Sequence, residues 1–197
     1  MPGRVGEVTR ETSETQIEVR WDLDGSGQYE VETSVGFLDH MLAALARHGR
    51  FDLRVKATGD LHIDEHHTVE DVGIVLGQAL NQALGDRRGL RRFGDARVPM
   101  DDALAEVAID LSGRGLGVLD VQVHGPAVGG INGQMFPHFF RSLAAEARLT
   151  LHATILRGEN DHHRVESLFK AFARALDDAT RIDELIAGEL PTTKGSL

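Results

Sequence analysis

An internal duplication constrains this chain more than any other feature. The phrase DEHHTVED at residues 64–71 returns as ENDHHRVES at 159–167. In both phrases two histidines are adjacent, and a glutamate follows the second histidine after two spacer residues. Similarity at a spacing of about half the chain predicts two copies of one structural unit.

The duplication extends beyond the histidine phrases. VRWDLDGSG at 19–27 matches VAIDLSGRG at 107–115, and 39–60 aligns with 137–158, which places His40 on His138. Residues 61–84 then align with 159–179. The glycine-rich segment HGPAVGGINGQ at 124–134 is an insertion in the second copy. The pattern therefore indicates a duplication followed by edits in the loops.

Apolar periodicity predicts strand, strand, helix, strand, helix in each copy. IEVRWDL and YEVETS flank the turn DGSG and predict a β-hairpin, which the second copy repeats around SGRG. Residues 37–48 and 67–84 have helical spacing, and FDLRVKA between them predicts a strand. PMDDA at 99–103 is expected to open the first strand of the second copy, after a connector at 85–95.

A sheet with helices on one face exposes apolar surface, so the two halves are expected to pack helix to helix. The predicted fold class is α+β, with internally duplicated ββαβα-type halves and two four-stranded sheets flanking a layer of four helices. We assign residues 1–90 to the first repeat, 91–185 to the second and 186–197 to a C-terminal tail. The two repeats together are expected to form one compact domain.

The composition excludes several classes of protein. The chain has no cysteine, which rules out disulfides and thiolate metal sites and is typical of a cytoplasmic protein. A formal net charge of −10 argues against a nucleic-acid partner. No apolar run approaches the roughly 20 residues that span a bilayer, and residues 1–12 lack the apolar core of a signal peptide. We therefore expect neither nucleic acid nor membrane as a partner.

The histidine phrases contain the residue types of a metal site. Adjacent residues diverge by about 100° around a helix, so adjacent histidines are suited to two different ions rather than one. Imidazole and carboxylate without thiolate suit Mn, Fe, Ni or Zn, and four ligands per ion leave positions open for a substrate. The eight candidate ligands form two matched sets of three histidines and one glutamate: His40, His66, His67, Glu70, His138, His162, His163 and Glu166.

Two other functions are compatible with the histidine pattern: a non-catalytic His/Glu metal-storage or sensor protein, and a Zn²⁺ hydrolase. A hydrolase needs a water-activating glutamate that is not itself a ligand. Lys170 also has an ordinary explanation, because it follows Glu166 at the spacing of a helical ion pair. Four histidines lack a full set of counterparts and are expected at the surface, in loops or in strands: His48, His62, His124 and His152.

A series of motifs resembles the imidazoleglycerol-phosphate dehydratase family of histidine biosynthesis. In order they are GFLDHML, EHHTVEDVGIVLGQAL, GLRRFGDA, VPMDDALA, DLSGR, ENDHHRVE, FKA and PTTKGSL, and the match runs from about residue 10 to the end. The resemblance implies a hydro-lyase that converts imidazole glycerol phosphate to imidazole acetol phosphate through a di-metal-bound imidazolate and an enol. It also implies two Mn²⁺ ions per active site and a cytoplasmic homo-oligomer of 24 subunits with shared active sites.

Carried over by position, the metal ligands of that family fall on the same eight residues. Glu14 matches a position near the substrate and is the expected proton acceptor, with a metal-bound water as the alternative. The catalytic residues implied by the resemblance are Glu14, His66, His67, Glu70, His162, His163 and Glu166. The further substrate contacts implied, chiefly to the phosphate, are Arg92, Arg114, Lys170, Thr192, Thr193 and Lys194.

Overall fold

The computed structural model describes residues 3–195, so the outermost residues of the predicted first repeat and tail (1–2 and 196–197) lie outside the described residues. The first half contains four strands and two helices. They are β1 (Val5–Glu11), β2 (Thr15–Asp22), β3 (Tyr29–Glu32), α1 (Gly36–Gly49), β4 (Asp52–Gly59) and α2 (His66–Leu84).

The second half repeats this order and adds a short ribbon and a terminal turn. Its elements are β5 (Phe93–Met100), β6 (Ala103–Asp110), β7 (Leu116–Asp120), β8 (Ala127–Val128), β9 (Ile131–Asn132), α3 (Met135–Glu146), β10 (Thr150–Arg157), α4 (Asp161–Thr180) and the 3₁₀ turn η1 (Glu184–Ile186). The boundaries assigned to the repeats and the tail stay an interpretation of the sequence.

Each half forms a four-stranded sheet of the same topology. The strand order is β1-β2-β4-β3 in the first sheet and β5-β6-β10-β7 in the second, while β8 and β9 pair separately. In both sheets the last strand of the order runs parallel to its neighbour and the other pairs are antiparallel. The duplication seen in the sequence is therefore also a duplication of strand order.

The predicted hairpin between β2 and β3 is wrong, and so is its copy between β6 and β7. β4 lies between β2 and β3, and β10 lies between β6 and β7. The DGSG segment instead crosses the end of β4, because Asp52 accepts hydrogen bonds from the backbone of Ser26 and Gln28 at 2.8 and 2.9 Å. In each half, the glycine-rich turn and the alternating residues around it correctly predicted a turn between two strands. They did not predict that a third strand lies between those two strands in the sheet.

The hairpins that do form join β1 to β2 and β5 to β6. Each half is therefore βββαβα, with one strand more than the predicted order. PMDDA does not open a strand as predicted, because Met100 ends β5 and Ala103 begins β6. The end of the predicted connector belongs to β5, which begins at Phe93. The exposed, charged residues of β1 and β5 conceal their strand periodicity.

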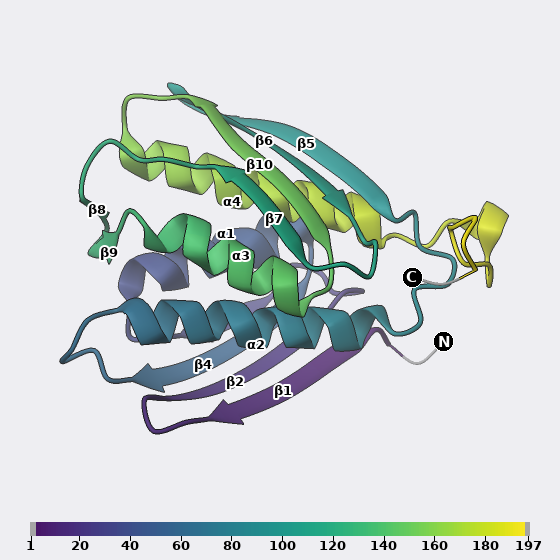
Figure 1. Ribbon diagram of the computed structural model, residues 1–197, viewed down its shortest axis with the longest axis horizontal. Helices are drawn as coiled ribbons and strands as arrows, with labels where there is room; N and C mark the ends of the chain where they lie inside the picture. Colours follow the sequence, from purple (N-terminus) through teal and green to yellow (C-terminus); the bar gives the residue numbers. More distant parts are fainter. Residues whose placement is uncertain (1–2, 196–197) are drawn as a thin grey trace.

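The four long helices form one layer between the two sheets (Figure 1). α2 packs against α3, and α1 packs against α4, so each helix contacts a helix of the other half. The α+β class, the two four-stranded sheets and the helix-to-helix packing predicted from the sequence are confirmed. The N-terminal ends of α2, α3 and α4 point the same way, toward the β8–β9 ribbon (Figure 1).

Two glycines let the helices approach the sheets at equivalent places. A Cβ atom on Gly6 of β1 would lie 1.9 Å from the Ala79 carbonyl oxygen, and one on Gly94 of β5 would lie 2.1 Å from that of Ala175. Real Cβ atoms do not occupy such positions, so both contacts require glycine. The two glycines are 88 residues apart and the two alanines 96, which matches the offsets of the repeat.

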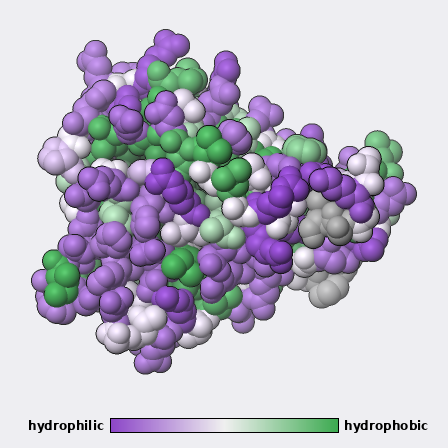
Figure 2. Space-filling view, in the orientation of Figure 1, coloured by the Kyte–Doolittle hydropathy of each residue, from purple (hydrophilic) through white to green (hydrophobic). Residues whose placement is uncertain are grey.

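The core between the layers is apolar, and its largest fully buried side chains include Trp21, Phe51, Phe139, Phe140, Phe169 and Phe172. The face seen in Figure 2 is mainly hydrophilic, and polar groups interrupt its apolar ones. No helix among residues 3–195 has both the length and the apolar character needed to cross a bilayer.

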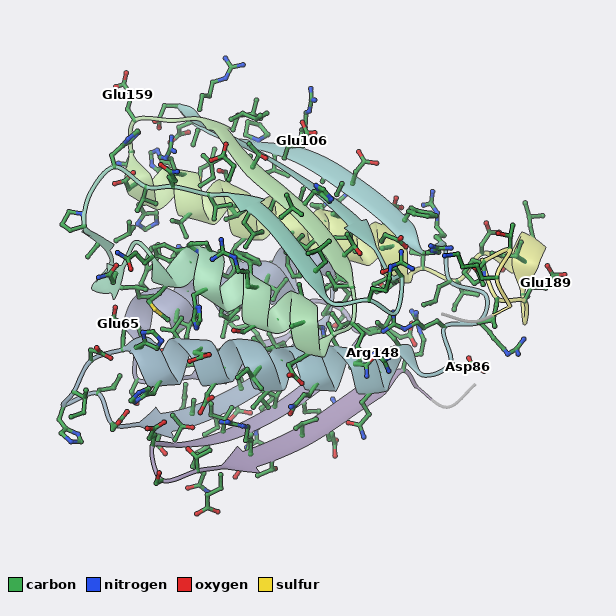
Figure 3. All side chains as sticks on the ribbon, in the orientation of Figure 1. Glu65, Asp86, Glu106, Arg148, Glu159 and Glu189 are labelled. Atoms are coloured by element: carbon green, nitrogen blue, oxygen red, sulfur yellow. The ribbon has the colours of Figure 1, made fainter. Side chains whose placement is uncertain are left out.

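The two ends of the helix layer carry different structures. At one end the β8–β9 ribbon is tied to α2, because the Asn132 amide donates a 2.7 Å hydrogen bond to Glu65. At the other end lies η1, on the right of Figure 1, close to Glu189, which Figure 3 labels. Leu90 pairs with Ile182 there through an isolated β-bridge. The histidine phrases belong to the first end and the tail to the second.

Candidate functional site

Both histidine phrases open a helix, and a side chain two residues before the first histidine accepts a hydrogen bond from its amide, as the N-cap residue in α4 and one position before the N-cap in α2. Asp64 accepts a 2.9 Å hydrogen bond from the His66 amide at the start of α2. Asn160 accepts from the amides of His162 and His163 at the start of α4, at 2.9 and 3.3 Å. Such caps satisfy the free N–H groups of a first helical turn. The local sequence thus orients the histidines at one end of the layer.

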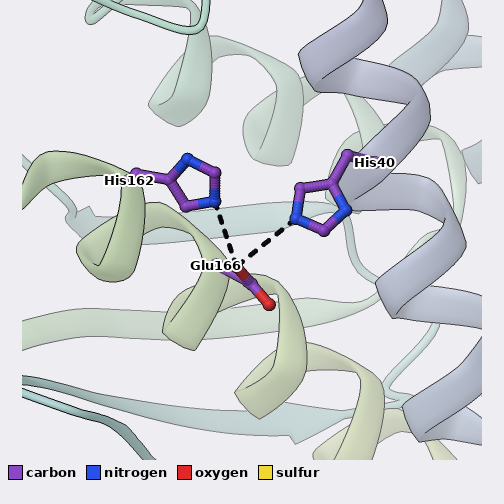
Figure 4. Close-up of side chains that lie close together, drawn as sticks. All are labelled: His40, His162 and Glu166. Carbon is purple, nitrogen blue, oxygen red and sulfur yellow. Dashed lines mark hydrogen bonds and ion pairs between the residues drawn. The ribbon is translucent and has the colours of Figure 1, made fainter.

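The first triad consists of His40, His162 and Glu166 (Figure 4). Oε2 of Glu166 lies 3.4 Å from Nε2 of His40 and 3.2 Å from Nε2 of His162. The Glu166 side chain is only 9 % exposed, whereas both imidazoles are about half exposed. Phe37 packs edge-on against His162, with ring centroids 5.0 Å apart, and supports it from the apolar side.

Lys170 forms an ion pair with the glutamate of the first triad. Its Nζ lies 2.7 Å from Oε1 of Glu166, the oxygen that does not face the histidines. Burial opposes ionisation of Glu166, but the hydrogen bond and charge of Lys170, together with His40, outweigh burial and lower the pKa of Glu166. Glu166 is therefore held as a carboxylate beside two imidazole nitrogens.

The second triad consists of His66, Glu70 and His138. Oε2 of Glu70 lies 3.6 Å from Nε2 of His66, and Oε1 lies 3.1 Å from Nε2 of His138. The residue equivalent to Lys170 is Ile74, which cannot form an ion pair with this carboxylate. The triad borders a cavity of about 670 Å³ whose lining includes Glu65, His66, Asn132, His138 and Arg141.

Each triad combines the two halves of the chain. His40 comes from the first copy, and it meets His162 and Glu166 from the second. His138 comes from the second copy, and it meets the phrase of the first. The sequence alignment grouped the ligands by copy, but helix-to-helix packing exchanges the upstream histidine between the copies.

The second histidine of each phrase does not join its triad. Nδ1 of His67 lies 3.0 Å from Asp60, and Nδ1 of His163 lies 2.7 Å from Asp102. Within each phrase the two imidazole planes are 69° and 82° apart, in the first and second copies respectively. The divergence expected for adjacent residues on a helix is therefore present in both copies.

Carboxylates from the first hairpin of each half also approach these histidines. Oε1 of Glu14, between β1 and β2, lies 3.9 Å from Nε2 of His67. Asp101, between β5 and β6, lies 3.7 Å from Nε2 of His163. Asp60, Asp101 and Asp102 were not predicted as site residues from the sequence. The acid pair inside VPMDDALA was a usable signal, whereas Asp60 had none beyond its place before the phrase.

The arginines expected to bind phosphate lie at the other end of the molecule. Nε of Arg92 donates to Asp110 at 2.7 Å, Nη1 donates to the Pro191 carbonyl at 2.6 Å, and Arg114 lies 3.8 Å from Asp110. The Arg92 amide donates to the carbonyl of Ala179, in the last turn of α4. Seventeen residues of helix separate Ala179 from His162, which is about 26 Å at 1.5 Å per residue.

The tail residues stay with the arginines rather than with the histidines. Thr192 and Lys194 form a local turn in which the Lys194 amide donates to the Thr192 hydroxyl at 3.1 Å, with Thr193 between them. Of the basic residues expected to bind substrate, Lys170 alone lies beside a triad. Within one chain six of the eight expected metal ligands come together in two triads. His67 and His163 contact other carboxylates, and Arg92, Arg114 and the tail lie apart from the triads.

The family model of imidazoleglycerol-phosphate dehydratase matches residues 33–176. The enzyme of that name from Halobacterium salinarum is 53 % identical over 197 residues and covers both chains completely. The one from Roseiflexus sp. RS-1 is 56 % identical over 194 residues and covers 98 % of each chain.

Solved structures agree with these relatives. Imidazoleglycerol-phosphate dehydratase from Staphylococcus aureus has a TM-score of 0.82 at 35 % identity, covering 91 % of this chain and 99 % of its own. The Pyrococcus furiosus enzyme, solved in complex with (S)-C348, has a TM-score of 0.83 at 39 % identity and covers 96 % and 100 %. The duplicated fold, the two histidine phrases and these matches show that the chain belongs to the imidazoleglycerol-phosphate dehydratase family and is a hydro-lyase.

Proposed function

We propose that this chain removes water from imidazole glycerol phosphate to give imidazole acetol phosphate, and that each active site uses two Mn²⁺ ions. Family membership supplies the dehydration step in histidine biosynthesis. The metal dependence is supported by the two triads, each with two imidazole nitrogens and a carboxylate within 4.8 Å of one another.

The donor atoms of both triads are suited to a divalent cation. Imidazole nitrogen and carboxylate oxygen, without sulfur, suit Mn²⁺ and its first-row neighbours. Nε2 of His138 is buried and makes no hydrogen bond within residues 3–195, although it lies 3.1 Å from Glu70. A buried polar atom without a partner costs free energy, and a cation shared with Glu70 would remove that cost.

When bound, the cations would supply Lewis acidity to the ring nitrogens and a hydroxyl oxygen of the substrate. The protein side chains have separate tasks. Glu14 is half exposed near His67. It would accept the proton that leaves the second diol carbon, while hydroxide leaves the first, which is attached to the ring. Loss of this proton together with hydroxide yields an enol, which converts to the ketone. Lys170 would attract the phosphate toward the first triad. The imidazolate route expected from the resemblance stays a prediction.

The proposal includes an active site shared between copies of the chain. The backbone of Arg92 is bonded to Ala179 near the end of α4, which is about 26 Å along the helix from His162. This is longer than a substrate made of one imidazole ring, a short diol chain and a phosphate. Arg92 and the tail would therefore serve the triads of a neighbouring copy. His67 and His163, turned away from the triads of their own chain, would likewise complete sites on neighbours. An assembly of 24 subunits, as implied by the resemblance, would provide such contacts.

The two alternative functions, a metal-storage or sensor protein and a Zn²⁺ hydrolase, are not favoured by any observation described above. A metal-storage protein would not account for the family match over the whole chain. A Zn²⁺ hydrolase would need a catalytic glutamate outside the ligand set, and the dehydration assigned to the family is not hydrolysis. The cytoplasmic location and the absence of nucleic-acid and membrane partners stay predictions.

The test is a dehydration assay on protein stripped with a chelator. We expect the stripped protein to lose turnover of imidazole glycerol phosphate and to regain it with Mn²⁺. Metal content per chain, measured together with native mass, should give two ions per active site and a large homo-oligomer. Full turnover by metal-free protein would contradict the proposed metal dependence, and a fully active monomer would contradict the shared site.

A further inference from the structure

Asp60 and Asp102 make the same contact in the two halves of the molecule. Each carboxylate lies within hydrogen-bond distance of Nδ1 of a histidine, at 3.0 Å for His67 and 2.7 Å for His163. The opposite nitrogen, Nε2, is left outside hydrogen-bond distance of its closest carboxylates, at 3.9 Å from Glu14 and 3.7 Å from Asp101.

This contact decides which nitrogen of each ring can bind a cation. A neutral imidazole has one N–H donor and one acceptor nitrogen, and an ionised carboxylate can only accept. The proton is therefore held on Nδ1, which leaves the lone pair on Nε2 free. A carboxylate bonded in this way also makes the imidazole a stronger ligand.

Asp102 is itself held in place by the backbone that precedes α4. Its other oxygen accepts hydrogen bonds from the backbone amides of Glu159 and Asn160, at 2.5 and 3.0 Å.

The two aspartates occupy positions that are not equivalent in the repeat. The alignment of 39–60 with 137–158 pairs Asp60 with Gly158. Gly158 has φ +141, and a Cβ there would lie 2.8 Å from Cβ of Ala103 and 2.9 Å from Cγ of Arg164, so no aspartate can replace it. The second half obtains its carboxylate from the β5–β6 turn instead. The two halves therefore make the same carboxylate–histidine contact from different positions in the repeat. Inheritance from a duplicated ancestor would not produce this, so the contact indicates that the histidine needs a carboxylate at Nδ1.

We propose that Asp60 and Asp102 are positioning residues that fix His67 and His163 in the tautomer with a free Nε2, so that this nitrogen can bind a catalytic cation. The inference rests on the proposed function, because it assumes that both histidines are metal ligands. It assigns no contact between either aspartate and the substrate.

The first test measures Mn²⁺ binding to metal-free protein, with the electron paramagnetic resonance signal of free Mn²⁺ as the readout. Asp60→Asn and Asp102→Asn should each weaken binding at the affected sites about 10- to 100-fold, the usual effect of losing a partner behind a metal ligand. Asp95→Asn, at an exposed position on β5, is the matched control and should bind Mn²⁺ like the wild type.

A second readout does not depend on metal. Nitrogen-15 NMR of histidine-labelled, metal-free protein should give His67 and His163 protonated on Nδ1 in the wild type and a mixture of tautomers in the asparagine variants. Asp60→Asn is the safer variant for folding, because among residues 3–195 its carboxylate accepts side-chain hydrogen bonds from His67 alone.

The outcomes separate the two proposals. Unchanged Mn²⁺ affinity and unchanged tautomers in both asparagine variants, with weaker binding in His67→Ala and His163→Ala, would overturn the positioning role and leave the proposed function intact. Unchanged Mn²⁺ binding in the two alanine variants would overturn the ligand roles on which both proposals depend.

Discussion

The two triads contain the same residue types in pseudo-equivalent places, but their electrostatic surroundings differ. Glu166 in the first is nearly buried and ion-paired with Lys170, whereas Glu70 in the second is 33 % exposed and has Ile74 at the equivalent position. The second triad borders a cavity lined in part by Arg141, whose counterpart in the first copy is Ala43. Duplication preserved the ligands and allowed their charge environment to diverge, so the two triads should bind cations unequally.

Removal of one histidine from either triad should have the largest effect. His66→Ala and His162→Ala should each reduce turnover by more than the roughly 100-fold expected for losing a partner behind a ligand. Steady-state kinetics in saturating Mn²⁺ measures this. His152→Ala, exposed on β10, should retain wild-type turnover. A variant of one triad that retained full activity would restrict catalysis to the other triad.

Adding a methyl group at Gly6 or Gly94, where a strand lies against a helix carbonyl, tests whether the two halves are also equivalent in packing. Gly6→Ala and Gly94→Ala should each lower the free energy of unfolding by about 1–3 kcal/mol or more, the usual cost of overpacking. The cause is the carbonyl oxygen of Ala79 or Ala175, which lies about 2 Å from the added atom (1.9 and 2.1 Å). Chemical denaturation of both variants should give similar losses, and a loss in one half only would contradict equivalent packing.

Changing the residue four positions after each triad glutamate, Lys170 or Ile74, should reverse the difference in cation affinity between the triads. Lys170→Met removes the ammonium that competes for Glu166, and hydrogen bonds to charged groups contribute about 1.5–3 kcal/mol. Cation binding at the first triad should therefore strengthen about tenfold or more. Ile74→Lys should weaken the second triad in the same way. Calorimetric titration of metal-free protein with Mn²⁺ should resolve two affinities in the wild type. A single affinity, unaltered by either variant, would contradict the predicted inequality.

The smallest effect is expected for the ion pair between Arg50 and Asp177, which joins the two halves outside the triads. Burial disfavours ionised Asp177, but hydrogen bonds from Arg50 and Arg181 outweigh burial and lower its pKa. Its stabilising contribution is therefore present above the unfolded pKa of about 3.9 and is lost as pH falls through the lower folded pKa. Asp177→Asn should cost about 0.5–1 kcal/mol near pH 7, because both arginines are largely exposed.

The pH dependence of unfolding checks this prediction against the first half, where the equivalent residue is Asn81. The difference between wild type and Asp177→Asn should shrink as pH falls below about 4, because the carboxyl of the unfolded chain is protonated first, and it should vanish once pH has passed the lower folded pKa. Asn81→Asp should stabilise the first half near pH 7, because Arg87 already donates to Asn81 at 2.8 Å. A pH-independent loss in Asp177→Asn would indicate packing rather than charge.

Much of the local structure could be predicted from the sequence. Apolar spacing located α1 and α2 to within a residue or two, and the repeat alignment found every member of both triads. The hairpin prediction failed because β4 pairs between β2 and β3. The residues of the turn do not predict this insertion, and the hydrogen bond from Ser26 to Asp52 at the start of β4 exists only in the folded chain. Asp102 was missed because no spacing relates a histidine to a carboxylate 61 residues away. Asp60 was missed although it is only 7 residues from His67, because the intervening loop has no periodicity that would place the two together.

By itself, the sequence determined that the chain is a duplication, that one helix of each half begins at a histidine phrase, and that adjacent histidines must diverge. These properties follow from periodicity, capping and helix geometry, which act over a few residues. Only the tertiary structure decided that His40 and His138 exchange partners between the halves, and that Arg92 lies a helix length from His162. Those relations depend on how two layers pack, and packing is set by the whole apolar surface rather than by any local pattern.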